Sequence, residues 1–252
     1  MFEDIKNRRV LITGANGGIG SAIADLFADH GAKLGLHYRK NNEETEKMLN
    51  KIKNKTEQAK IFQADLLDTE SRKNLIENFI KNFGGIDVLI NNAGAIDDYK
   101  HFSELSEAAW QNTFDLNVKV PFYLSGEAFQ YMKEHGGGRI INISSVNVKY
   151  GGSARSLHYV AAKAALENLG LGFAKEGAPY NILVNSIRCG VIDTPMRTKV
   201  AGYDEENFKK RINLIPLKRA GQPIDIARMA LFLAAESGNF ITGEVFTIAG
   251  GD

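Results

Sequence analysis

The sequence predicts an α/β fold: a single doubly wound domain in which a seven-stranded parallel sheet carries helices on both faces. Two observations carry this prediction. Short continuous apolar runs recur along the chain, as in strands buried on both faces. Amphipathic segments alternate with these runs, which favours parallel strands joined by right-handed crossovers. No linker or repeat interrupts the 252 residues, so we expect one domain over residues 1–252.

The apolar runs and the amphipathic segments define the expected elements in chain order. The expected strands are Arg9–Thr13, Lys33–Tyr38, Lys60–Ala64, Asp87–Asn91, Arg139–Ser144, Ile182–Ile187 and Glu244–Ile248. The expected helices are Ile19–His30, Glu43–Lys53, Glu70–Phe83, Glu107–Lys133, Leu157–Glu176 and Ile224–Ala235. Three consecutive glycines, at 136–138, predict a tight connection into the fifth strand.

The segment 191–219 is the least regular part of the sequence. It contains Pro195, Pro216 and many charges, and it shows no strand pattern. Long segments of this kind are often functional lids. We therefore expect a substrate lid here, with a surface insertion as the alternative.

Composition excludes several classes of partner. The hydrophobic content of 44% and the charged content of 24% are typical of a globular protein with a sizeable core. The net charge of +1 gives no reason to expect nucleic acid or a membrane as a partner. The single cysteine, Cys189, excludes an internal disulfide and fits a cytoplasmic location. The five histidines lack ligand spacing, so we expect no metal.

A glycine-rich turn, residues 13–20, follows the first expected strand and opens the first expected helix. Glycines allow the backbone to approach a ligand closely, and the free N–H groups at a helix N-terminus favour phosphate. The strict G-x-G-x-x-G pattern is absent because Asn16 takes the second glycine position. The position of the turn favours a dinucleotide site over a purely structural turn.

The end of the second expected strand bears on the choice of dinucleotide. An NAD site usually has an acidic residue there, but this chain reads Tyr38-Arg39-Lys40. Arginine suits a 2′-phosphate, so the sequence favours NADP(H), with NAD(H) still possible. The alternative is that both cations face solvent.

Tyr159 and Lys163 stand four residues apart in an expected helix, so both side chains lie on one face. An ammonium beside a phenol stabilises the phenolate, which makes the pair a plausible proton donor near neutral pH. Tyr150 and Tyr180 are rival tyrosines, but neither has a lysine four residues later.

Four segments now coincide in order: the glycine turn, Asn91-Asn92-Ala93-Gly94, Ser144-Ser145 and Tyr159-x-x-x-Lys163. Together they closely resemble the short-chain dehydrogenase/reductase family, over essentially the whole chain. The resemblance implies a Rossmann-type domain that transfers hydride between nicotinamide and a carbonyl or secondary alcohol.

The resemblance also implies a catalytic set. Tyr159 would exchange the proton, while Lys163 would stabilise the phenolate and bind the nicotinamide ribose. Ser145 would hydrogen-bond the carbonyl oxygen. Asn117 would hold a water that relays protons. Strand alternation allows only one of Ser144 and Ser145 to point into the site, and the family pattern favours Ser145.

The same resemblance implies the cofactor contacts. Gly14, Gly18 and Gly20 would line the pyrophosphate, and Asp65 would hydrogen-bond the adenine. The implied set is Gly14, Asn16, Gly17, Gly18, Ile19, Gly20, Arg39, Asp65, Leu66, Asn91, Ala93, Gly94, Tyr159, Lys163, Gly190, Ile192 and Thr194. Of these, Asn91 and Gly94 would border the adenine ribose, and Ile192 and Thr194 would hold the carboxamide.

This sequence departs from the family pattern in three places. Cys189 replaces the usual proline, which relaxes the backbone near the nicotinamide; a buried small side chain is favoured over a reactive thiol. Gly17 stands where NADP-preferring members often have a cation. The spacing from Ser145 to Tyr159 is one residue longer than usual, which leaves substrate assignment open.

The overall pattern is most similar to 3-oxoacyl-(acyl-carrier-protein) reductases, with sugar, polyol and steroid dehydrogenases as alternatives. Substrate contacts are expected from 96–101, 146–158 and 191–213. Basic Arg155, Arg197 and Lys199 would suit an acidic carrier protein, unless they are ordinary loop charges. A non-catalytic dinucleotide-binding regulator is the alternative of a different class. The family's habit of packing through its long helices implies a homotetramer, or a homodimer.

Overall fold

The computed structural model describes residues 2–40, 43–195 and 204–252. Within them, a seven-stranded, all-parallel sheet runs in the order β3-β2-β1-β4-β5-β6-β7. The strands are β1 (Arg9–Ile12), β2 (Lys33–Tyr38), β3 (Ala59–Gln63), β4 (Val88–Asn91), β5 (Gly138–Ser145), β6 (Ile182–Cys189) and β7 (Val245–Ile248). The predicted doubly wound fold is confirmed.

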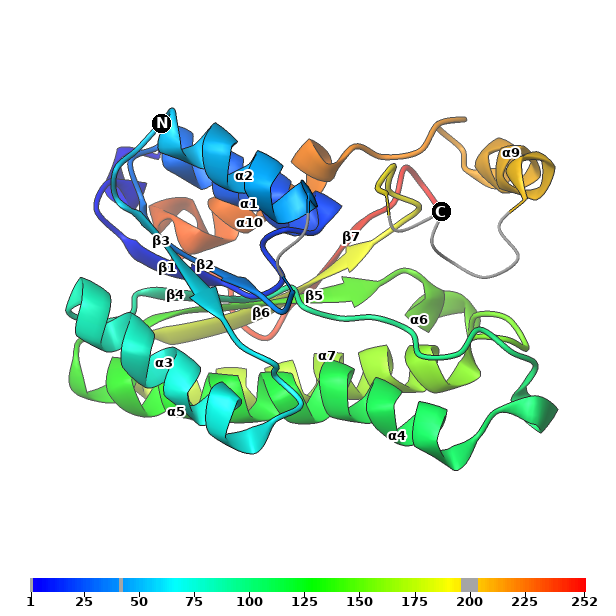
Figure 1. The fold of residues 1–252 in the computed structure, drawn as a ribbon, viewed down its shortest axis with the longest axis horizontal. Helices are drawn as coiled ribbons and strands as arrows, with labels where there is room; N and C mark the ends of the chain where they lie inside the picture. The colour runs from blue at the N-terminus through cyan, green and yellow to red at the C-terminus, as the bar shows by residue number, and fades with distance from the viewer. Residues whose placement is uncertain (1, 41–42, 196–203) are drawn as a thin grey trace.

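Helices cover both faces of the sheet (Figure 1). One face carries α1 (Gly18–Asp29), α2 (Glu43–Lys53) and α10 (Pro223–Ala234). The other carries α3 (Thr69–Phe83), α4 (Glu107–Phe114), α5 (Val120–Glu134) and α7 (Leu157–Gly177). Short 3-10 turns lie at Glu3–Ile5, Phe102–Glu104, Ala178–Tyr180 and Glu236–Gly238. No helix in the described ranges is both long and apolar enough to cross a membrane.

Two apolar cores hold these layers to the sheet. Ile23 and Phe27 of α1 are buried with Ile226 of α10 on one face. Phe79 of α3 and Leu124 of α5 are buried on the other. Most residues of β1, β2, β4, β5 and β6 are buried between these cores, which explains the continuous apolar runs in the sequence.

The helix predicted over Glu107–Lys133 is not continuous, which corrects that expectation. A π-helical turn, η3 (Asp115–Lys119), separates α4 from α5. Such widened turns hold one extra residue and occur frequently at functional sites. This one contains Asn117, whose side chain is fully buried.

Two short helices lie in segments where the sequence showed no clear periodicity. α6 (Asn147–Tyr150) follows β5, and α9 (Glu205–Leu214) lies inside the expected lid. Both lie toward the end of the sheet where β5 and β6 finish (Figure 1). The substrate candidates Met196, Arg197 and Lys199 fall outside the described residues.

The amino edge of the sheet is closed by an ion pair. Asp87, just before β4, accepts hydrogen bonds from the Arg9 backbone N–H and Nε, both at 2.8 Å. Its second oxygen lies 2.5 Å from Arg9 Nη2. This pairing lowers the pKa of Asp87 against the opposing effect of its burial. The Arg9 guanidinium and the Asp87 carboxylate therefore satisfy each other's hydrogen-bonding groups at the amino ends of β1 and β4.

Candidate active site

A cavity of about 410 Å³ opens at the carboxyl edge of the sheet. In open α/β sheets this edge is where ligands bind. The cavity is lined by Gly14, Asn16, Gly17, Gly18, Ile19, Gly20, His37, Arg39, Asp65, Leu66, Leu67, Asn92, Ala93, Gly94, Ala95, Leu116, Ile143, Ser144, Ser145, Tyr159, Lys163, Cys189, Gly190, Ile192 and Thr194. Of the predicted site residues, Asn91 and Asn117 do not line it.

The glycine turn forms one wall of this cavity. Gly14 adopts the left-handed conformation with φ of 62°, which a side chain would strain. At Gly20, a methyl group would overlap the carbonyl oxygen of Gly14. The Asn92 amide holds the turn in place, because its Nδ2 donates to the carbonyl oxygens of Thr13 and Gly14 at 2.9 and 3.0 Å.

The first turn of α1 fits a phosphate group. Gly17 precedes the helix and provides no side-chain cap, and the first turn contains no acidic residue. The N–H groups and the positive end of the helix dipole therefore face the cavity without a competing carboxylate from this turn. This is the arrangement in which helix N-termini bind the phosphates of dinucleotides.

His37 ties the glycine turn to the next strand and was missed in the sequence. The backbone N–H of Gly14 donates to His37 Nδ1 at 3.0 Å, and Nε2 lies 3.1 Å from the carbonyl oxygen of Ala64. These partners assign a neutral ring with its proton on Nε2. Burial lowers the pKa of His37 to about 4, so the ring is neutral near pH 7.

One end of the cavity brings Arg39 and Asp65 together with the glycine turn. Asp65 Oδ1 accepts a hydrogen bond from the backbone N–H of Leu67 at 3.1 Å. Asn16 Nδ2 donates to Thr45 Oγ1 at 2.7 Å, which links the turn to α2. The Arg39 side chain is exposed at the cavity mouth.

Asn91 lies away from the cavity that the resemblance expected it to border. Its Nδ2 donates to Ser125 Oγ at 3.0 Å and to Asn142 Oδ1 at 2.9 Å. These contacts join β4 to α5 and β5 inside the protein. The Asn91 side chain therefore connects elements inside the protein and does not border the cavity.

Tyr159 and Lys163 lie at the other end of the cavity on α7. Lys163 Nζ donates to the carbonyl oxygen of Ile143 at 2.9 Å and lies 5.6 Å from the centroid of the Tyr159 ring. Burial lowers the pKa of Lys163 to about 8. Burial also raises the pKa of Tyr159, with a smaller contribution from Cys189. In this state desolvation outweighs the stabilisation of phenolate that the sequence predicted.

The π-helical turn η3 supplies Asn117. Its Nδ2 donates to the carbonyl oxygens of Ala95 and Thr113 at 2.7 and 2.8 Å. Its Oδ1 is buried and has no partner among the described residues. A methyl group on Gly94 would lie 2.7 Å from this Oδ1 and 2.9 Å from Lys163 Nζ, so both polar atoms border one small space.

The two adjacent serines at the end of β5 have different surroundings. The Ser144 hydroxyl donates to the buried Glu167 carboxylate at 2.6 Å. The Ser145 hydroxyl accepts a 3.3 Å hydrogen bond from the backbone N–H of Asn147, which leaves its own hydrogen available. This geometry favours Ser145 as the serine that meets a ligand.

The residues after β6 form a further wall of the cavity. Gly190, Ile192 and Thr194 line the cavity, and Thr194 packs against Gly18, where a methyl group would lie 2.7 Å from its Cγ2. Cys189 is buried, and burial raises the pKa of its thiol to about 12. A thiol in that environment stays protonated near pH 7, as a packing residue would.

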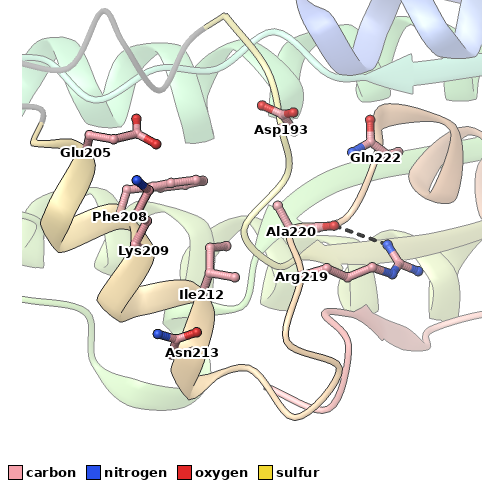
Figure 2. Close-up of a pocket in the computed structure, with 9 residues that line it drawn as sticks. All are labelled: Asp193, Glu205, Phe208, Lys209, Ile212, Asn213, Arg219, Ala220 and Gln222. Atoms are coloured by element: carbon pink, nitrogen blue, oxygen red, sulfur yellow. Dashed lines mark hydrogen bonds between the residues drawn. The ribbon is translucent and has the colours of Figure 1, made fainter.

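A second cavity, of about 580 Å³, lies beside the first under α9. Figure 2 shows Phe208 and Ile212 of α9 on one side, and Asp193, Arg219 and Gln222 on the other. Asp193 is followed directly by Thr194 of the first cavity. The expected lid segment therefore contributes to both cavities.

Several cavity residues had little signal in the sequence. Asn92 lies within the Asn-Asn-Ala-Gly segment, so its position was marked but its contacts were not. His37 precedes Tyr38 in an apolar strand and looked like an ordinary core residue. Further lining residues that were not predicted are Leu67, Ala95, Leu116, Ile143 and Ser144.

A Rossmann-type sheet with this glycine turn at its carboxyl edge defines a dinucleotide-binding protein. The family model described as Enoyl-(Acyl carrier protein) reductase matches residues 14–251. A solved structure from Sinorhizobium meliloti, provisionally assigned to the short-chain alcohol dehydrogenases, has a TM-score of 0.92 and 30% identity, and covers 100% of this chain and 98% of its own. The chain therefore belongs to the short-chain dehydrogenase/reductase family of oxidoreductases, which bind nicotinamide cofactors.

Curated relatives are named for different substrates. A 3alpha-hydroxysteroid dehydrogenase from Mediterraneibacter gnavus is 36% identical, covering 99% of this chain and 98% of the relative. The NADPH-dependent aldehyde reductase 1 of Arabidopsis thaliana is 36% identical, covering 98% and 86%. A 3-oxoacyl-(acyl-carrier-protein) reductase from Staphylococcus aureus is 34% identical, covering 97% of each chain.

Proposed function

We propose that this protein is an NADPH-dependent carbonyl reductase, acting most readily on a 3-oxoacyl group carried by acyl-carrier protein. One observation carries the proposal: Ser145, Tyr159 and Lys163 meet in the cavity whose other end is the uncapped glycine turn. When bound, the nicotinamide supplies the hydride, and the protein supplies orientation and proton handling.

The protein groups divide the proton chemistry among them. Tyr159 is a neutral phenol near pH 7, so it can donate a proton to the carbonyl oxygen. Ser145 offers its hydroxyl hydrogen to the same oxygen. Lys163 faces the phenol ring and stabilises the phenolate left behind. The space shared by Lys163 Nζ and Asn117 Oδ1 suits a water that returns the proton.

The preference for NADP(H) is supported by charge at the adenosine end. Arg39 lies at the cavity mouth beside Asp65 and the glycine turn. A guanidinium binds phosphate with two hydrogen bonds and favours a 2′-phosphate over a hydroxyl. The Arabidopsis relative is named for NADPH dependence. The cofactor contacts inferred from the sequence are proposed for the cavity-lining members of that set, without the side chain of Asn91.

The proposed substrate class rests on the relatives and on charge around the site. The Staphylococcus relative is a 3-oxoacyl-(acyl-carrier-protein) reductase, and Lys149 of α6 and Arg155 lie between Ser145 and α7. Basic residues suit an acidic carrier. The Mediterraneibacter relative makes a hydroxysteroid the second candidate. We infer that residues 1–252 form one domain, with 191–219 as its substrate lid.

We also propose a cytoplasmic homotetramer. Exposed apolar side chains lie on α4, α5 and α7, including Trp110, Phe122, Tyr123 and Leu171. A second exposed group includes Phe232 and Phe240 near β7. Exposed apolar side chains are typical of protein interfaces, and two separate groups of them would allow a dimer of dimers.

Replacing Tyr159 with phenylalanine tests the mechanism. The change removes the proton donor and retains the ring, so we expect kcat for carbonyl reduction to fall by about 100-fold or more. NADPH binding, measured by fluorescence titration, should stay within about twofold. Turnover near the wild-type rate in Tyr159→Phe would exclude the proposed proton transfer. A substrate panel of 3-oxoacyl thioesters, steroids, aldehydes and sugars identifies the carbonyl.

Replacing Arg39 with alanine tests the cofactor preference. We expect the dissociation constant for NADPH to rise by about tenfold or more, because a charge-assisted bidentate contact is lost. The constant for NADH should change by less than about twofold. Lys81, a distant solvent-facing cation on α3, gives the control Lys81→Ala. Equal weakening of both cofactors in Arg39→Ala would reject the 2′-phosphate role.

A further inference from the structure

Glu167 extends the face of α7 that carries the reactive pair. Tyr159, Lys163 and Glu167 recur every four residues, so their side chains follow one another along the helix. Unlike the other two, Glu167 does not line the cavity. Its side chain is only 8% exposed. A carboxylate removed from water to this extent needs partners of its own.

The partners of Glu167 come from two neighbouring strands. Oε1 accepts from Ser144 Oγ at 2.6 Å and from Arg188 Nε at 2.8 Å. Oε2 accepts from Arg188 Nη2 at 2.6 Å. Ser144 and Arg188 are register partners in the β5–β6 pair. One carboxylate therefore joins α7 to both strands at a single level of the sheet.

That level lies directly below the reacting groups. Ser145 and Cys189, the next residues of the two strands, are the following register pair and line the cavity. Lys163 donates to the carbonyl oxygen of Ile143, the residue before Ser144. Two successive turns of α7 are thus fixed to successive residues of β5. The hydrogen bonds of Glu167 prevent α7 from sliding along that strand.

The Glu167 carboxylate also acts electrostatically on Lys163. Lys163 faces Tyr159 and Glu167 on its own helix, Cys189 on β6 and the Asn117 amide on η3. Burial lowers the pKa of Lys163, and Cys189 and then Glu167 oppose this effect. Glu167 is the one carboxylate among these groups. The Glu167 carboxylate forms an ion pair with the Arg188 guanidinium.

We propose that Glu167 is a positioning residue for the proton-transfer pair. Through Ser144 and Arg188 it locks the Tyr159–Lys163 face of α7 against the ends of β5 and β6, and its carboxylate lies one helical turn beyond Lys163. This inference rests on the function proposed above.

The variant Glu167→Gln retains the shape of the side chain and removes its charge. Lys163 then loses the one carboxylate charge that favours its protonated form, so we expect the pKa of Lys163 to fall by about one unit. This titration is followed by NMR of isotope-labelled lysine in the ligand-free protein, with Lys163→Met to assign the signal. The alkaline limb of the kcat profile for NADPH-dependent reduction should move to lower pH by a similar amount.

The control is the matched ion pair at the opposite edge of the sheet. Asp87→Asn also breaks a bidentate arginine–carboxylate contact, between Arg9 and Asp87. It should lower the unfolding temperature and leave the Lys163 titration and the pH profile unchanged. If Glu167→Gln behaves like Asp87→Asn in all three measurements, Glu167 is only a structural partner and the inference is wrong.

Two further outcomes remain decisive. If the wild-type protein reduces no carbonyl with either cofactor, the proposed function fails, but the ligand-free titration still decides the electrostatic role of Glu167. If Glu167→Gln does not fold, Ser144→Ala removes one hydrogen bond and keeps the charge. We expect Ser144→Ala to lower kcat several-fold with the Lys163 titration intact. Wild-type kcat and KM in Ser144→Ala would overturn the positioning role.

Discussion

Two helices that begin at the carboxyl edge of the same sheet begin in opposite ways. α3 starts with Asp68, whose side chain accepts a 2.8 Å hydrogen bond from the backbone N–H of Ser71. Glu70 adds a second negative charge in its first turn. α1 starts with Gly17 and has neither a side-chain cap nor an acid in its first turn.

The difference separates a helix start that stabilises the fold from one that is open to a ligand. Asp68 uses the N–H groups of α3 internally, and this hydrogen bonding lowers the pKa of its carboxyl. The N–H groups of α1 keep their capacity for a phosphate. The chain thus gives up capping stability at this helix start, which borders the glycine-lined cavity.

The largest expected effect comes from giving α1 the cap that α3 has. Gly17 has φ −76° and ψ 164°, and a methyl group there would make only an ordinary 3.4 Å contact with Gly14, so Gly17→Asp fits sterically. Its carboxylate would compete with phosphate for the N–H groups. We expect the NADPH dissociation constant to rise by about 100-fold or more, which is about 2.7 kcal/mol. Calorimetric titration measures it.

Thermal unfolding of the same variant sharpens the comparison. Ligand-free Gly17→Asp should unfold at the wild-type temperature or above it, because the new cap stabilises α1. Asp68→Ala is the reciprocal control, and should lower the unfolding temperature while retaining NADPH affinity. If Gly17→Asp binds NADPH as the wild type does, phosphate does not bind at the start of α1.

A smaller effect is expected from acid, acting through His37 at the base of the same turn. Its folded pKa of about 4 lies below the 6.5 of an unfolded histidine. Stability is therefore fully present above about pH 6.5 and is lost as the pH falls toward 4. Between pH 7 and pH 5 this group should contribute a loss of about 2 kcal/mol. Denaturant unfolding at the two pH values measures the total change.

The variant His37→Gln isolates this contribution from those of the other titrating groups. A glutamine can accept from Gly14 N–H and donate to the Ala64 carbonyl without titrating. We expect its stability to depend less on pH than that of the wild type, by about the stated amount. Parallel pH dependences in the two proteins would contradict the assignment of a buried neutral His37.

The sheet and most helices followed from periodicity because both faces of the sheet are covered. Runs such as Val10-Leu11-Ile12 have no polar alternation, and all three side chains are fully buried. Periodicity carried no information about α6 and α9, which are short and largely exposed. The break between α4 and α5 was also missed, although Pro121 in the first turn of α5 lacks the N–H that an uninterrupted helix would use there.

The residues predicted to carry the chemistry could be selected from the sequence because their types and spacing are restricted. The residues that position them could not. Tyr159 and Lys163 stand out by type and spacing. Glu167 continues the same spacing but resembles any polar helix residue, and its burial depends on Arg188, distant in sequence. Asn91 misled because its motif fixes the strand end and not the direction of its side chain, which points into the sheet.

The π-helical turn η3 has a consequence for the phase of the helices it joins. One additional residue in a helical turn rotates everything beyond it by about 100° relative to an uninterrupted helix. The face of α4 that packs against α7 is therefore not in phase with the face of α5 that packs against the sheet. Deleting a single residue from 115–119 would restore a regular helix while turning Asn117 away from Gly94 and Lys163. In this segment a regular helix and the observed orientation of the Asn117 amide exclude each other. The chain adopts the π turn, which directs the amide toward Gly94 and Lys163.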